Sequence, residues 1–101
     1  MEPQLDIHEA LKALAHPGRL DFLKWLKHPE QYFGLTSADV QGSVPAGRFE
    51  LQGLSQSAAS QNLAILQRAG LLASRRAGST ILYRRNEEMI AQLKCWIASE
   101  L

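Results

Sequence analysis

The segment spanning residues 55–72 constrains the fold most, because it carries a start signal, a regular apolar period and a stop signal for one helix. Ser55 is of a type preferred at helix N-caps, and Gly70 is of the type preferred just after a helix C-terminus. One face of the predicted helix is apolar, formed by Ala59, Leu63, Leu66 and residues 69–71. The opposite face is small or polar without charge, and comprises Gln56, Ser57, Ser60, Gln61 and Ala64.

A β-hairpin is predicted directly after this helix. Residues 71–76 and 81–85 are extended runs with β-branched and aromatic content, separated by the sequence Ala-Gly-Ser-Thr at residues 77–80. The hairpin is strongly basic, with the arginines Arg75, Arg76, Arg84 and Arg85. We therefore expect a two-stranded basic hairpin packed next to the capped helix.

Three further helices are predicted from periodicity and caps. Residues 5–15 show a 3.6-residue apolar period with Asp6 near the start, and Pro17 suits the first position of a second helix that reaches residue 27. Asn86 is expected to cap a last helix over residues 87–99. Residues 30–53 are rich in glycine with little periodicity, which predicts mostly loop, with a short helix over residues 46–52 as the alternative there.

The length of 101 residues fits one domain with one core, whose stability a second subunit would supplement. Cys95 is the single cysteine, which excludes an intramolecular disulfide and favours a reducing compartment. No stretch reaches about 18 consecutive apolar residues, and the start lacks the basic and apolar regions of a signal peptide. We expect a cytoplasmic protein.

The formal net charge of +1 hides a gradient along the chain. Residues 1–50 contain five basic and seven acidic residues, whereas residues 51–101 contain six basic and three acidic ones. Residues 51–86 contain five arginines and no acid. Such a tract suits a polyanion, and its simpler alternative is a solvated basic face.

The order of elements is that of a winged helix-turn-helix, a mainly α fold with a small β-hairpin, here predicted with five helices and a two-stranded wing. In that arrangement the capped helix enters a major groove of DNA and the hairpin lies along the backbone. Glutamine and serine side chains can bond to base edges, a helix N-terminus can bind a phosphate, and arginines attract phosphates regardless of sequence. An ordinary surface helix that simply faces water is the alternative for residues 57–69.

Three blocks of sequence resemble one family. Residues 13–26 read ALAHPGRLDFLKWL, residues 53–72 read GLSQSAASQNLAILQRAGLL, and residues 74–86 read SRRAGSTILYRRN. Together they cover about half the chain and resemble the ArsR family of small bacterial winged-helix transcriptional regulators. The stretch 28–53 departs from the family pattern, with Pro45, Gly47 and Arg48 where a regular third helix is usual.

The resemblance implies a homodimer, joined through its first and last helices and bound to palindromic operator DNA. The positions that match the family's groove-reading residues are Gln56, Ser57, Ser60 and Gln61, and Gly78 and Ser79 fall at the wing tip. We expect residues 1–101 to form one DNA-binding domain with dimerisation helices at both ends. The candidate interface residues, which could instead be plain core, are Leu5, Ile7, Leu93, Trp96 and Ile97.

No metal, cofactor or enzymatic site is expected. The chain lacks a paired-cysteine motif, and its three histidines are scattered without ligand spacing. A glycine-rich phosphate loop, a nucleophile elbow and a paired-carboxylate constellation are also absent from the sequence. Cys95 is interpreted most simply as a buried small hydrophobe, with a thiol sensor or a disulfide across a dimer axis as alternatives.

The sequence therefore predicts a homodimeric winged-helix regulator of transcription, a repressor that binds double-stranded DNA and is released by an unidentified small-molecule or redox signal. Its rival from another class is a winged-helix module that binds a protein and no DNA. The acid-free basic tract over residues 51–86 favours the first, because a module that binds only protein has no need of it.

Overall fold

In the computed structural model, which describes residues 4–34 and 43–101, the chain opens with two helices that meet at Pro17. Helix α1 is Ile7–Leu14, and the carboxylate of its N-cap Asp6 accepts a hydrogen bond from the backbone N–H of Glu9. Helix α2 is Pro17–Lys27, with Pro17 in its first turn as predicted. The Nδ1 atom of the N-cap His16 accepts from the N–H of Gly18, which satisfies one of the free donors at the start of α2.

The prediction of mostly loop over residues 30–53 is wrong in two places. A short helix α3, Pro29–Phe33, follows α2 and ends at Gly34, and a short strand β1, Val44–Pro45, comes later. The alternative of a short helix over residues 46–52 is confirmed by the 3-10 helix η1, Ala46–Gln52. The part of the predicted loop at residues 35–42 and the chain start at residues 1–3 lie outside the described residues.

Helix α5, Gln56–Arg68, matches the prediction from its start to its end. The Ser55 hydroxyl accepts from the backbone N–H of Ala58, and the chain turns away at Gly70, whose φ of 86° is the left-handed conformation that glycine adopts without strain. The predicted apolar face is buried at Ala59, Leu63 and Leu66.

The hairpin has a third strand beside it. Strands β2, Leu72–Ala77, and β3, Thr80–Arg85, pair antiparallel, and β1 pairs with the other edge of β3, so the order is β1-β3-β2. The predicted two-stranded wing is confirmed by β2 and β3, and the sequence analysis missed β1, which makes the sheet three-stranded. A strand of two residues carries no alternation to detect, and Pro45, which lacks an N–H, is tolerated because β1 lies at the sheet edge.

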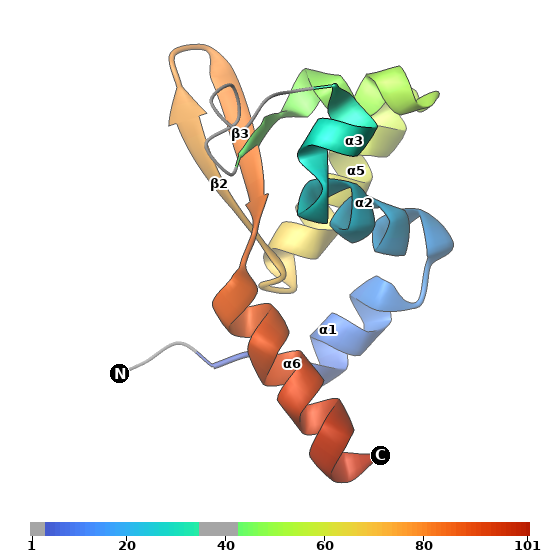
Figure 1. Cartoon of the computed structure of the whole chain (residues 1–101), viewed down its shortest axis with the longest axis vertical. Helices are drawn as coiled ribbons and strands as arrows, with labels where there is room; N and C mark the ends of the chain where they lie inside the picture. Colours follow the sequence, from blue (N-terminus) through green and yellow to red (C-terminus); the bar gives the residue numbers. More distant parts are fainter. Residues whose placement is uncertain (1–3, 35–42) are drawn as a thin grey trace.

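The last helix, α6, Glu87–Glu100, lies with α1 at one end of the molecule, and the hairpin projects at the other end (Figure 1). The Asn86 side chain accepts from the backbone N–H of Met89, which confirms the predicted cap. The backbone N–H of Leu5 donates to Oε1 of Gln92 at 2.9 Å, so the segment before α1 is fastened to α6.

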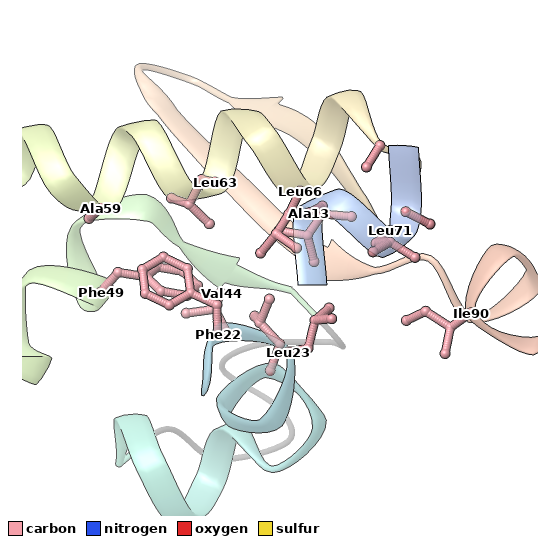
Figure 2. Packing of buried hydrophobic residues seen from close by; sticks show 14 of the residues in the cluster. Ala13, Phe22, Leu23, Val44, Phe49, Ala59, Leu63, Leu66, Leu71 and Ile90 are labelled. Atoms are coloured by element: carbon pink, nitrogen blue, oxygen red, sulfur yellow. The ribbon is translucent and has the colours of Figure 1, made fainter. Parts of the chain in front are cut away.

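The core lies between α5 and the elements that precede it. Figure 2 shows the inner face of α5 over Phe22 and Phe49, whose ring centroids are 4.8 Å apart. The largest fully buried side chains come from α2, β1, η1, α5 and the start of the hairpin, and are Phe22, Val44, Phe49, Leu63, Leu66 and Leu71. The outer face of α5 consequently stays in solvent. Within the described ranges, no helix combines the length and apolar character needed to cross a bilayer.

Candidate nucleic-acid interface

The outer face of α5 exposes all four of its predicted groove-reading residues, Gln56, Ser57, Ser60 and Gln61. They sit in the first two turns of the helix; Ser57 and Gln61 point away from the buried Leu63, whereas Gln56, seven residues before Leu63, lies at the border of the buried face. The first turn contains no acidic residue, and the first N–H groups of a helix lack partners within it. This end of α5 therefore offers hydrogen-bond donors and acceptors in a field that favours an anion.

A turn and a second short helix complete the arrangement around α5. The 3-10 helix η1 ends at Gly53, whose φ of 87° reverses the chain direction before Ser55 starts α5. A hollow of about 110 Å³ lies between η1 and α5. Glu50 lines it from η1, and Gln56 and Ser60 line it from α5.

Two exposed charged residues of η1 were missed by the sequence reasoning, namely Arg48 and Glu50, of which Glu50 lines this hollow. Both precede the basic tract on which that reasoning relied, so neither was weighed for DNA contact. The predicted short helix over residues 46–52 could have identified both residues as candidates, because in a helix-turn-helix the helix directly before the groove-reading helix also lies close to DNA.

The strand register divides the hairpin arginines between its two faces. Arg75 pairs with Leu82 and Arg84 with Ala73, which places both arginines on one face. Arg76 pairs with Ile81 and Arg85 with Leu72, which places these two on the other. Arg75, Arg76 and Arg84 are exposed, as are Gly78 and Ser79 at the tip.

Arg85 differs from the other three arginines, because its guanidinium is engaged within the chain. Its Nε atom donates to Oε1 of Glu87 at 2.6 Å, and its Nη1 atom donates to the backbone oxygen of Leu23 at 3.1 Å. The Arg85 side chain is only 12% exposed. The structure thus brings Arg85 to the junction of β3, α2 and α6, where its guanidinium is engaged although it lines one hollow with exposed Arg84.

The predicted interface residues gather at the α1–α6 end of the molecule, with one exception. Leu5 and Ile7 line one side of a groove of about 510 Å³, and Trp96 lines the other. Ile97, on α6, is 37% exposed. Leu93 is only 5% exposed and belongs to the core of the single chain, so its assignment to a subunit interface is corrected.

Cys95 is exposed, which corrects its interpretation as a buried small hydrophobe. The sequence places it close to the apolar Leu93 and Trp96, but a residue two positions from buried Leu93 points about 200° away around the helix. The Cys95 side chain instead lines the groove with Leu5 and Trp96. Among the described residues, no group of three His, Cys, Asp or Glu side chains is placed to hold a metal ion.

The amino-acid sequence of this chain is similar to those of known transcriptional regulators. No protein-family model matches the chain. The HTH-type transcriptional regulator YbzH of Bacillus subtilis is 37% identical over 97 residues, which cover 92% of this chain and 96% of the relative. The biofilm growth-associated repressor of Xylella fastidiosa is 36% identical over 74 residues, and this chain spans 64% of that relative's length.

Solved structures are similar along nearly the whole chain. A protein described as a possible transcriptional regulator for arsenical resistance superposes with a TM-score of 0.70 at 26% identity, covering 90% of this chain and 82% of its own. A homodimeric winged helix-turn-helix DNA-binding domain from Mycobacterium bovis, described as a possible ArsR-family transcriptional regulator, gives a TM-score of 0.65 at 27% identity. That similarity covers 98% of this chain and 88% of the Mycobacterium domain.

The inward placement of Arg85 leads to a stability prediction. Replacing Arg85 with alanine removes two hydrogen bonds of a nearly buried cation, so we expect the free energy of unfolding to fall by about 1–3 kcal/mol. Arg75→Ala removes an exposed side chain of the same type and should change it by less than about 0.5 kcal/mol. Urea unfolding followed by circular dichroism measures both, and equal effects would show that Arg85 is not anchored as described.

Proposed function

This chain belongs to the ArsR family of winged helix-turn-helix transcriptional regulators, and from that premise we propose that it is a homodimeric repressor that binds a palindromic DNA operator. The observation that carries the proposal is the exposed, acid-free polar face at the start of α5, together with three exposed arginines on the hairpin that follows it. A DNA partner places the protein in the cytoplasm. Relatives and structural neighbours are regulators rather than enzymes, and this chain is likewise not an enzyme.

Helix α5 is proposed to read the major groove. Gln56, Ser60 and Gln61 carry donors and acceptors that can meet base edges, and their exposure in the first two turns of α5 supports contact within one groove. Ser57, in the first turn, is suited to a phosphate at the helix N-terminus. The apolar anchor of the opposite face, with Leu63 and Leu66 buried, holds this surface in place.

The wing is proposed to bind the DNA backbone. Arg75, Arg76 and Arg84 supply attraction that is independent of sequence, and the exposed tip residues Gly78 and Ser79 allow close approach of the main chain to a phosphate. Arg85 is left out of this proposal, since its guanidinium already bonds to Glu87 and Leu23. It positions the base of the hairpin against α2 and α6 instead.

The second subunit is proposed to bind at the α1–α6 end. The groove lined by Leu5, Ile7 and Trp96 lies beside exposed Ile97, and the described Mycobacterium neighbour is a homodimer. A twofold dimer presents two copies of α5 to two half-sites of a palindrome. Release from DNA by a small-molecule or redox signal is part of the proposal.

The base-reading proposal is tested by replacing Gln56, Ser60 and Gln61 together with alanine. Each lost base contact should cost about 1–3 kcal/mol of binding free energy and relax the sequence preference. The measurement is selection of bound DNA from random sequence by the purified protein, followed by gel-shift titration of the selected operator. Gln31→Ala, an exposed glutamine change on α3, is the control and should leave the titration unchanged.

Either of two outcomes would count against the proposal. A triple variant with the affinity and preference of the wild type would show that α5 does not read bases. A wild-type protein that selects no DNA at all would favour the rival reading of a winged-helix module that binds only protein.

The proposal that the wing binds the DNA backbone is tested by the salt dependence of DNA affinity. Arg75→Gln should reduce the slope of log affinity against log salt by up to about one unit per lost phosphate contact in each subunit, as should Arg84→Gln. Lys94→Gln, a charge loss at an exposed position of α6, away from the hairpin and α5, should leave the slope unchanged. Gel-shift titrations from about 50 to 200 mM salt give the slopes, and parallel slopes for all three variants would refute a specific role for the wing.

The dimer proposal predicts a change of mass in solution. Light scattering should give twice the 11.2-kDa chain mass at micromolar concentration. Ile97→Glu places a charge on the proposed interface and should shift the protein toward a monomer, because burying an unpaired carboxylate is costly. Leu20→Glu, at a 50% exposed position on α2, is the matched control and should remain dimeric. A monomeric wild type, or equal behaviour of both variants, would contradict the interface.

A further inference from the structure

The carbonyl of Ala13 needs a donor that the helix backbone cannot supply. In a continuous helix this oxygen, in the last turn of α1, would accept from the N–H four residues later. That residue is Pro17, which has no N–H. The Nε atom of Arg19 donates to the Ala13 oxygen instead, at 2.6 Å. A side chain from the first turns of α2 therefore closes the end of α1.

The same guanidinium also reaches α5. Its Nη1 atom donates to Oδ1 of Asn62 at 3.3 Å, and both Arg19 and Asn62 are half-buried. The planar guanidinium carries several donors in a fixed arrangement, so one side chain can hold two acceptors at a set angle. Arg19 thus joins three elements directly, because it belongs to α2 and bonds to both α1 and α5.

The apolar packing around this junction does not by itself fix the angle between the helices. Helix α1 contributes the buried Ala10 and Ala13 to the core, and Ile7, Leu11 and Leu14 pack against it. The apolar attraction that holds these residues is non-directional, so it resists separation of the helices better than it fixes their angle. Hydrogen bonds from Arg19 to fixed acceptors on α1 and α5 restrict that rotation.

We infer that Arg19, through its bonds to Ala13 and Asn62, is the positioning residue that sets the angle between the dimer-forming end and the groove-reading helix. In the dimer, this angle determines the separation and relative twist of the two α5 helices. It therefore determines which spacing of DNA half-sites the dimer accepts, since each added base pair changes the separation by about 3.4 Å. The inference rests on the proposed function as a dimer on a palindrome.

The test replaces Asn62 with alanine, because this removes the α5 end of the link and leaves the bond to Ala13 in place. Affinity is measured for the selected operator and for operators with one base pair added or removed between the half-sites. The preference of the wild type for its own spacing should fall by about 2- to 30-fold in Asn62→Ala. Affinity for a single half-site should stay within about twofold, because the groove-reading face is unchanged.

Two further variants separate positioning from a general loss of stability. Asn62→Asp retains an acceptor for Arg19 and should keep the spacing preference of the wild type. Gln67→Ala removes another side-chain hydrogen bond of α5, from Gln67 to Ser74 of the hairpin at 2.8 Å, and should also leave the spacing preference unchanged. Light scattering confirms that each variant is compared as a dimer.

The outcomes distinguish this inference from the function on which it rests. A wild-type spacing preference in Asn62→Ala, or an equal loss of affinity for single half-sites and for all spacings, would overturn the positioning role of Arg19 while leaving operator binding intact. The same holds if Gln67→Ala relaxes the preference as much as Asn62→Ala does. Failure of the wild type to bind any DNA would overturn the proposed function, and the inference with it.

Discussion

Burial of one face of α5 is the constraint on which the rest of the structure depends. Ala59, Leu63 and Leu66 close the core over Phe22 and Phe49, and the aromatic pair draws α2 and η1 together beneath the helix (Figure 2). Because the buried face holds α5 against the core, the outward face of α5 needs no packing partner and can consist of polar residues. Stability and the candidate function therefore use opposite sides of one helix, and a change on one side can leave the other intact.

The sequence predicted best those features that short-range signals determine. Asp6, Ser55 and Asn86 each accept a hydrogen bond at a helix start, as their residue types indicated. Gly70 ends α5, and the hairpin follows at once. These signals act within a few residues, so no knowledge of the tertiary structure was needed to detect them. They were sufficient to identify the winged helix-turn-helix order and the exposed face of α5.

The features that the sequence did not predict depend on partners distant in the chain. Strand β1 forms because Val44 pairs with Tyr83 of β3. The side chain of Gln52 donates a hydrogen bond to the backbone oxygen of Tyr32, which joins η1 to α3. Arg85 resembles its neighbours in sequence, but the register of β2 and β3 turns it toward Leu23 and Glu87. In a strand, a shift of one position exchanges an outward side chain for an inward one, so composition alone could not separate Arg84 from Arg85.

The net charge of +1 is the sum of a basic hairpin and an acidic α1–α6 end. The hairpin strands carry four arginines and no acid, whereas α1 and α6 together carry four acidic residues against two lysines. The hairpin projects at one end of the molecule and α1 and α6 lie at the other (Figure 1), and Arg85 meets Glu87 where β3 joins α6. A polyanion therefore attracts the hairpin end and repels the α1–α6 end, which orients each subunit before any base is read. The weak overall charge limits sequence-independent binding, so discrimination depends on the groove-reading face and on how accurately two such faces are positioned.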